Sequence, residues 1–261
     1  MDLGLKDRLI VVSGGGSGIG AAVTLACLHE GARVVILARR SPNVDEFFAE
    51  SEPDPSRCFL VEAHLEDLDR CKSAIGEILD QHGDIYGLVN NAGINDVAGL
   101  EDGSIEDFLQ SLRRNLHHYY ALAHYALPSL KRTRGAIVNI SSKVALTGQG
   151  NTSGYAASKG AQLALTREWA AELAPYDIRV NAVLPAEVMT PLYRRWLDTL
   201  PDPDAELKRI TTKIPLGNRM TLSSEIAAAT VFLLSPTQSG HTTGQHLVVD
   251  GGYVHLDRSL T

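Results

Sequence analysis

The chain of 261 residues is long enough to bury a sizeable core, as one large domain or two small ones. Its formal net charge of −7, with no basic stripe along the sequence, argues against nucleic acid as a partner. No apolar run is long enough to cross a bilayer, and the first residues lack the basic segment and apolar core of a signal peptide. The three cysteines stand neither in CxxC nor in Cys/His metal spacing. We therefore expect a cytoplasmic protein with reduced thiols, no membrane partner and no metal site.

A glycine-rich stretch, SGGGSGIG at residues 13–20, follows an apolar and β-branched run at residues 8–13 that is typical of a buried strand. Apolar residues then recur at helical spacing until Gly31, where a helix would stop. A strand, a tight turn and a helix start form a phosphate cradle, because free N–H groups and the positive end of the helix dipole favour an anion. The spacing fits the GxGxxA form of the dinucleotide fingerprint and also a wider GxxxGxG form, with a glycine-rich surface turn as the alternative.

Strand and helix patterns alternate along the rest of the chain. Seven candidate strands are nearly all apolar, at residues 8–13, 32–38, 57–63, 85–92, 135–142, 178–185 and 246–252. Such strands indicate burial on both faces and hence a parallel sheet. The repeated units predict an α/β fold: one Rossmann-type domain over residues 1–261, a doubly wound parallel sheet of about seven strands with helices on both faces. In such a sheet, ligands bind beyond the carboxyl ends of the strands.

Three chemically suited side chains follow the fifth candidate strand: Ser142 at its end, then Tyr155 and Lys159. The last two are four residues apart and so share one face of a helix. A tyrosine with a pKa of about 10 is a poor base at neutral pH, but a nearby ammonium favours the phenolate and lowers that pKa. Ser142 would hold a substrate oxygen while Tyr155 moves its proton, which suits hydride transfer to or from a nicotinamide. The alternative is an exposed Tyr/Lys pair on a helix.

Together and in this order, the motifs resemble the short-chain dehydrogenase/reductase family over essentially the whole chain. The glycine loop carries Ser13 where the family more often has threonine, and NNAG at residues 90–93 resembles its fourth-strand signature. The segment LPAEVMT at residues 184–190 matches one in which Ala186 replaces the usual glycine. The resemblance implies a nicotinamide-dependent oxidoreductase. It also implies a homotetramer, because the last strand and two long helices commonly pack across two-fold axes in this family.

The resemblance also assigns roles to residues. The family's catalytic tetrad matches Asn115, Ser142, Tyr155 and Lys159, with Asn115 expected to hold a water that links Lys159 to solvent. The residues expected to bind the cofactor are Gly14, Ser17, Gly18, Ile19, Gly20, Arg39, Arg40, His64, Leu65, Asn91, Gly93, Tyr155, Lys159, Pro185, Val188 and Thr190. The glycines among them would let the backbone approach the pyrophosphate.

The end of the second candidate strand, ARVVILARR, bears on the choice of cofactor. An acidic residue there would bind the ribose 2′-hydroxyl of NAD. Ala38 stands in its place, followed by Arg39 and Arg40, whose guanidiniums suit a 2′-phosphate. NADP is therefore favoured; NAD is possible, since both arginines are alternatively solvated surface charges. His64, where the family often has an aspartate that touches adenine, would contact the base or only cap its strand.

The loops expected to wall the substrate pocket are rich in amides and carboxylates. The expected substrate contacts are Ser142, Gln149, Asn151, Tyr155 and Glu187, and we expect a substrate lid near residues 186–215. A polar pocket suits a compact substrate with several hydroxyls, whereas a steroid or an acyl chain needs a largely apolar one. Loops are polar in any case, so part of this polarity alternatively faces water.

Two stretches, residues 141–170 and 185–196, resemble bacterial sugar 1-dehydrogenases of the family, especially L-fucose dehydrogenases. They predict NAD(P)-dependent oxidation of L-fucose or a related aldose at C1 to the lactone. One alternative is a carbonyl reductase for 3-oxoacyl thioesters or steroids. Another is a regulator that binds NAD(P) without turnover, although such proteins commonly lack the tyrosine and lysine that are present here.

Overall fold

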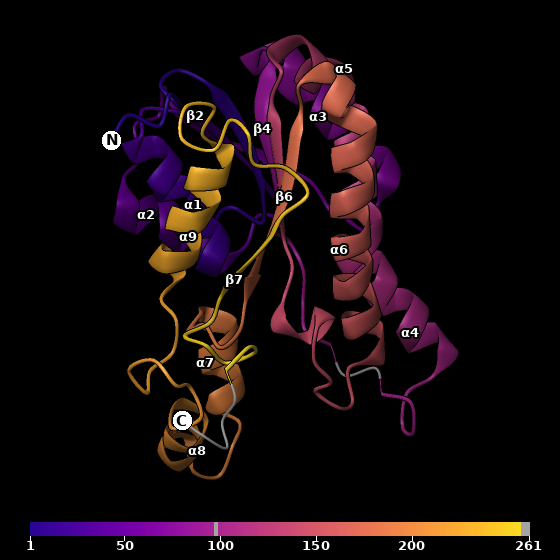
Figure 1. Cartoon of the computed structure of the whole chain (residues 1–261), viewed down its shortest axis with the longest axis vertical. Helices are drawn as coiled ribbons and strands as arrows, with labels where there is room; N and C mark the ends of the chain where they lie inside the picture. The colour runs from indigo at the N-terminus through magenta and orange to yellow at the C-terminus, as the bar shows by residue number, and fades with distance from the viewer. Residues whose placement is uncertain (97–98, 257–261) are drawn as a thin grey trace.

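Seven parallel strands form a single sheet at the centre of the computed structural model, which describes residues 1–96 and 99–256 (Figure 1). The strand order is β3-β2-β1-β4-β5-β6-β7. The strands are β1 (Leu9–Ser13), β2 (Arg33–Ala38), β3 (Cys58–Glu62), β4 (Ile85–Asn90), β5 (Ala136–Ile140), β6 (Arg179–Pro185) and β7 (His246–Val249). Each lies within a run that the sequence predicted, so the expected parallel sheet is confirmed.

The apolar sequences of the central strands match their burial. All five residues of β1 are buried, and Val11 pairs with Val35 of β2 on one side and with Leu88 of β4 on the other. The chain therefore starts in the middle of the sheet and winds outward in both directions, as the doubly wound prediction requires.

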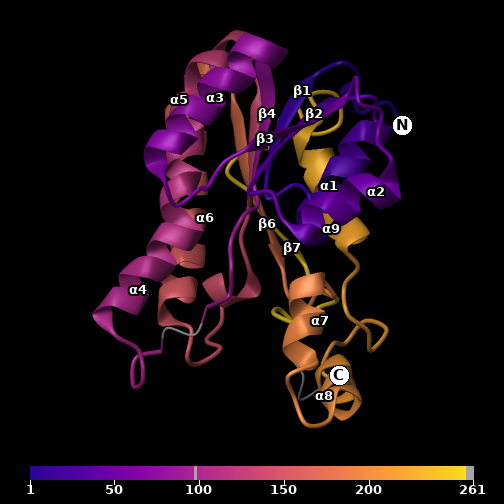
Figure 2. The ribbon, with the colours of Figure 1, turned by 180° about the vertical axis from the view of Figure 1, so that it is seen from behind.

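Helices cover both faces of the sheet (Figures 1 and 2). One layer holds α1 (Gly18–His29), α2 (Pro42–Ser51) and α9 (Ser223–Leu234). The other holds α3 (Leu68–His82), α5 (His118–Thr133) and α6 (Ser153–Leu173). Separate apolar clusters lie between the sheet and each layer, so the core has the two halves of a three-layer sandwich. None of the helices in the described residues combines the length and apolar character that a membrane crossing requires.

The remaining helices lie toward the carboxyl ends of the strands, in the lower half of Figure 1: α4 (Ile105–Leu112), α7 (Pro191–Leu197) and α8 (Pro203–Thr211). Because the strands are parallel, the segments that follow β1, β4, β5, β6 and β7 emerge at this same edge. The sheet thereby gathers residues that are far apart in the sequence, and the candidate site is built from them.

Candidate active site

Ser13, the last residue of β1, ties the glycine loop to the segment after β4. Its hydroxyl oxygen accepts from the backbone N–H groups of Asn91 at 2.9 Å and Ala92 at 3.1 Å. The amide of Asn91 in turn donates to the Ser13 carbonyl at 2.9 Å. Serine thus supplies the hydroxyl that joins the two segments. Asn91, an expected cofactor contact, lies beside the glycine loop as a result, whereas Gly93 lies against Asn115.

The glycine loop forms a cradle that side chains would fill. A Cβ on Gly20 would lie 2.1 Å from the Gly14 carbonyl oxygen, so only glycine fits at that position. Gly18 begins α1 with a left-handed φ of +54°, which favours glycine. Among the described residues, no side chain caps the N-terminus of α1, and its first turn carries no acidic residue. Open N–H groups at the positive end of a helix fit a pyrophosphate, so these residues suit a dinucleotide.

The other loop residues expected at the cofactor lie around this cradle. Ser17 precedes α1, and its hydroxyl accepts from Asn43 at 3.4 Å. Ile19 packs its partly buried side chain against the core. A Cβ on Gly18 would come within 3.3 Å of Thr190, so the segment after β6 reaches the start of α1.

The segment after β6 runs from Pro185 to the start of α7 at Pro191 and is held in place by two contacts. Val188 is buried and forms a short bridge with Thr221. The hydroxyl of Thr190 accepts from the Tyr193 N–H at 3.2 Å and so caps α7. Ala186, which stands where the family usually has glycine, lies between the end of β6 at Pro185 and the bridge formed by Val188.

The two arginines after β2 are in different surroundings. Both are exposed, but the Arg40 guanidinium donates to Asp45 at 3.0 Å and lies 3.8 Å from Glu62. No carboxylate in the described part of the chain pairs with Arg39. Arg39 is therefore the more available cation. The exposed His64 and the half-buried Leu65 follow β3, the strand beside β2.

Asn115 lies in a π-helical turn, Arg113–His117, between α4 and α5, and is fully buried. Its side-chain oxygen accepts from the Ile94 N–H at 2.8 Å, and its amide donates to Ser111 O at 3.0 Å. Its main-chain carbonyl accepts from the amide of Gln162 at 2.7 Å. The main-chain carbonyl of Asn115, where a water was expected to bind, already accepts a hydrogen bond from Gln162.

Ser142, Tyr155 and Lys159 come together at the start of α6. The Lys159 ammonium lies 5.4 Å from the centroid of the Tyr155 ring and donates to Ile140 O at 2.9 Å and Gln162 Oε1 at 3.3 Å. It also lies 3.5 Å from the hydroxyl of the buried Tyr119. The geometry rules out the exposed-pair alternative, because Lys159 is only 3% exposed.

The pKa values in this group differ from the expectation. Burial raises the pKa of Tyr155 to about 12, although a hydrogen bond with Ser142 acts in the opposite direction. Burial also lowers the pKa of Lys159 to about 7. The expected depression of the tyrosine pKa by the ammonium is therefore not seen here. Desolvation disfavours both charged forms, and Lys159 is directed to the Ile140 carbonyl.

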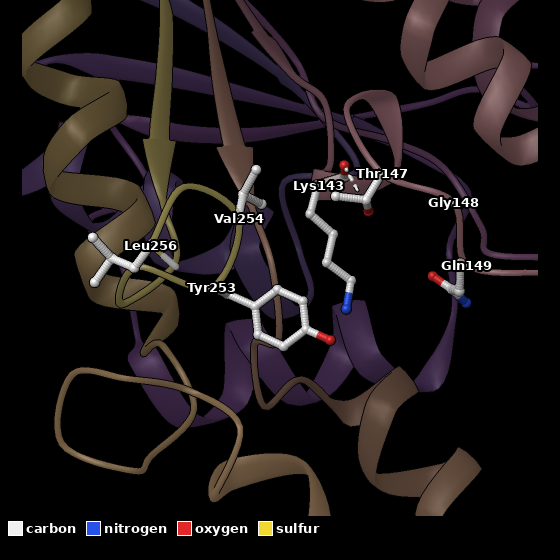
Figure 3. A pocket seen from close by; sticks show the side chains of 7 residues that line it. All are labelled: Lys143, Thr147, Gly148, Gln149, Tyr253, Val254 and Leu256. Atoms are coloured by element: carbon white, nitrogen blue, oxygen red, sulfur yellow. Dashed lines mark hydrogen bonds between the residues drawn. The ribbon is translucent and has the colours of Figure 1, made fainter. Parts of the chain in front are cut away.

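A cavity of about 530 Å³ has Lys143, the residue after Ser142, in its wall (Figure 3). It is lined by Lys143, Thr147, Gly148, Gln149, Tyr253, Val254 and Leu256. Gln149, an expected substrate contact, is thus part of the wall. Glu187 binds Lys143 of this wall in an ion pair. Asn151 is exposed in the loop before α6 and lies against Gly99, so the structure does not bring it to the cavity wall.

Sequence reasoning missed three polar residues of this region. Gln162 follows Lys159 by three residues on the same helix face, a spacing that was available as a signal. Tyr193 and Tyr253 reach the region from α7 and from the turn after β7, and nothing in their local sequence marks them. No cluster of metal-ligating side chains occurs within residues 1–96 and 99–256.

Comparisons with known proteins agree with this geometry. A family model described as enoyl-(acyl carrier protein) reductase matches residues 14–254. L-fucose dehydrogenase of Bos taurus is 36% identical over 246 residues, which are 94% of this chain and 88% of the relative. The 3-oxoacyl-acyl-carrier-protein reductase of Thermotoga maritima is 34% identical over 251 residues, 96% of this chain and 99% of the relative.

The crystal structure of a protein named Cj0485 dehydrogenase superposes with a TM-score of 0.94 at 43% identity, covering 100% of this chain and 99% of that one. Both the fold and the sequence are thus matched over nearly the full length. The chain therefore belongs to the short-chain dehydrogenase/reductase family, whose oxidoreductases use a nicotinamide cofactor on the CH–OH group of a small molecule.

Proposed function

We propose that this protein oxidises a small neutral aldose, L-fucose or a close relative, at C1 to the lactone. The observation that carries the proposal is the cavity that begins at Lys143, the residue after Ser142. Its wall holds the polar Lys143, Thr147 and Gln149 beside the apolar Val254 and Leu256. A polyol needs such donors and acceptors, whereas a steroid or an acyl chain needs an apolar wall. The name of the Bos taurus relative, L-fucose dehydrogenase, supports the same substrate class.

The catalytic roles follow from the chemistry of the group. Tyr155 takes the proton of the anomeric hydroxyl while Ser142 holds its oxygen by a hydrogen bond. Lys159 stabilises the phenolate and holds the nicotinamide ribose, and Asn115 fixes the segment after β4 through Ile94. A bound nicotinamide dinucleotide supplies the hydride acceptor.

The proposed cofactor is NADP, with NAD as the alternative. Gly14, Ser17, Gly18, Ile19 and Gly20 hold the pyrophosphate, and Arg39 binds the 2′-phosphate. The free guanidinium of Arg39 and the alanine at position 38 support this preference, because neither repels a phosphate.

Substrate contacts and surroundings complete the proposal. Gln149 and Glu187 bind ring hydroxyls, and residues 186–215, which contain α7 and α8, act as the lid. Asn151, which lies away from the cavity wall, is not part of the proposal. The free, buried cysteines are consistent with a protein of the reducing cytoplasm.

Exposed apolar side chains such as Tyr120 on α5 and Leu247 on β7 support a homotetramer, which light scattering at micromolar protein would test.

The deciding experiment follows reduction of both cofactors spectroscopically with L-fucose, L-galactose and D-arabinose. Oxidation of at least one aldose, with stoichiometric lactone, is expected. If all three fail while a 3-oxoacyl thioester or a steroid turns over, the sugar assignment is wrong.

One observation favours a second candidate. The Thermotoga maritima relative is named as a 3-oxoacyl-acyl-carrier-protein reductase and is nearly as similar as the L-fucose dehydrogenase. The same catalytic group would serve that reaction in the reducing direction. The polar wall and the ion pair beside it argue against a long acyl chain.

A further inference from the structure

Four side chains from three distant segments meet beside the cavity. Lys143 follows β5, Glu187 and Tyr193 follow β6, and Tyr253 follows β7. Lys143 and Glu187 form an ion pair in which their side chains are only 12% and 13% exposed. The second carboxylate oxygen of Glu187 accepts from the Tyr193 hydroxyl at 2.8 Å. The Lys143 ammonium lies 4.2 Å from the centroid of the Tyr253 ring.

The cluster is held from both sides. Burial and the adjacent carboxylate raise the pKa of Tyr193, so its hydroxyl stays protonated and donates to Glu187. On the other side, the carboxylate of Asp250 accepts from the N–H groups of Gly252 at 2.7 Å and Val254 at 2.8 Å. That turn carries Tyr253, and Figure 3 shows its ring and the Lys143 side chain extending toward each other in the cavity.

A nearly buried ion pair needs an explanation other than stability. Removing two charges from water is costly, and a buried ion pair is weak evidence of a stabilising role. Within residues 1–96 and 99–256, the side chains of Lys143 and Glu187 form hydrogen bonds only with members of the cluster, and none of these bonds joins them to a strand of the sheet. A function at the cavity explains the presence of this buried pair better than stability does.

The chemistry of the pair is complementary to a hydroxyl group. An ammonium only donates and a carboxylate only accepts, while a hydroxyl donates once and accepts twice. We propose that Lys143 and Glu187 together bind one ring hydroxyl of the sugar, which accepts from Lys143 and donates to Glu187. Tyr193 fixes the carboxylate and Tyr253 fixes the ammonium. The pair is neutral overall, so it selects an uncharged polyol. This inference rests on the proposed sugar oxidation and names the residues that bind one hydroxyl of the sugar.

The test compares the wild type with the double variant Lys143→Met/Glu187→Gln, which keeps both shapes and leaves no unpaired buried charge. The substrates are L-fucose and its 2-, 3- and 4-deoxy analogues. In the wild type, one analogue should lose about a hundredfold or more in kcat/KM, because a site built for a hydroxyl rejects its absence. In the double variant, the penalty for that analogue should fall about tenfold or more, because the glutamine forms only neutral hydrogen bonds and the methionine forms none. The other two ratios and the cofactor affinity should stay unchanged.

Two further variants separate this reading from a structural one. Tyr193→Phe should weaken the same discrimination in part, since Glu187 loses its fixed orientation. The double variant Arg132→Met/Asp84→Asn, which removes an exposed ion pair that is not part of the cavity wall, should leave all ratios unchanged. Sugar turnover with identical ratios in wild type and double variant would overturn the inference alone. Absence of any sugar turnover by the wild type would overturn the proposed function and the inference with it.

Discussion

The side-chain amide of Gln162 donates a 2.7 Å hydrogen bond to the main-chain carbonyl of Asn115. Its oxygen accepts from the Lys159 ammonium at 3.3 Å, and the side chain is fully buried. The π-helical turn that contains Asn115 interrupts the regular helical hydrogen bonding, which leaves this carbonyl free for a side chain. One glutamine therefore links two members of the expected tetrad where a water was expected.

Replacement of Gln162 by leucine should shift the pH dependence of oxidation. The ammonium of Lys159 loses an acceptor, so its pKa falls below about 7 and less charge supports the Tyr155 phenolate. Hydrogen bonds to charged groups contribute about 1.5–3 kcal/mol, so kcat at neutral pH should fall roughly tenfold or more. The acid limb of kcat/KM should move to higher pH, as measured by initial rates across the pH range.

Thr166→Val is the matched control, because Thr166 donates to the Gln162 main-chain carbonyl at 2.7 Å without contacting Lys159. It should lower stability by about 1–3 kcal/mol, because the buried Asn139 amide also loses its acceptor, and leave the pH profile in place. An unshifted profile in Gln162→Leu would mean that the glutamine only packs.

Tyr155→Phe should abolish most turnover while the protein still binds its cofactor. The substitution keeps the ring and removes the titrating oxygen, and general acid–base catalysis contributes roughly 10²–10⁴-fold. Because burial raises the Tyr155 pKa to about 12, the phenolate is a minor form at neutral pH, and wild-type oxidation should accelerate as pH rises. Tyr119→Phe also removes a hydroxyl beside Lys159 and should keep most of the rate. Equal losses in both variants, measured as kcat, would contradict the assignment of Tyr155.

Much of this architecture is readable from the sequence, because its signals are local. The β-branched runs bounded by charged residues and glycines predict each of the seven strands. The strand context of the glycine loop predicts the cradle at α1. Tyr155 and Lys159 are recognisable because their spacing on one helix is itself the chemical requirement.

The remainder depends on tertiary contacts that no local pattern carries. The Tyr155 pKa is set by the burial that the folded chain imposes. Arg40 is engaged by Asp45 and Glu62, which two different segments supply. Tyr253 reaches Lys143 across more than a hundred residues of sequence, so its place at the cavity follows only from the order of the strands.

Arg39→Ala should weaken NADP binding by roughly tenfold or more and leave NAD binding nearly unchanged. One charge-assisted hydrogen bond is worth about 1.5–3 kcal/mol, and only NADP carries the phosphate that would accept it. Arg40→Ala is the matched control: its guanidinium is already paired with Asp45, so the loss should be smaller. Fluorescence titration of both reduced cofactors measures this. A wild-type preference for NAD, or equal losses for both cofactors, would show that Arg39 does not read the phosphate.

His118 should make the protein less stable in mild acid. The ring is 1% exposed, its Nε2 lies 3.1 Å from the Ala92 carbonyl, and burial lowers its pKa from 6.5 to about 4. The unfolded chain therefore binds more protons than the folded one between these two pH values, so stability is full above pH 6.5 and falls as pH drops toward 4. The loss amounts to at most about 3 kcal/mol at 1.36 kcal/mol per pKa unit. Urea unfolding at a fixed protein concentration should show this loss reduced in His118→Asn and retained in His117→Asn, whose side chain is exposed. An unchanged acid dependence in His118→Asn would place the destabilisation on other groups.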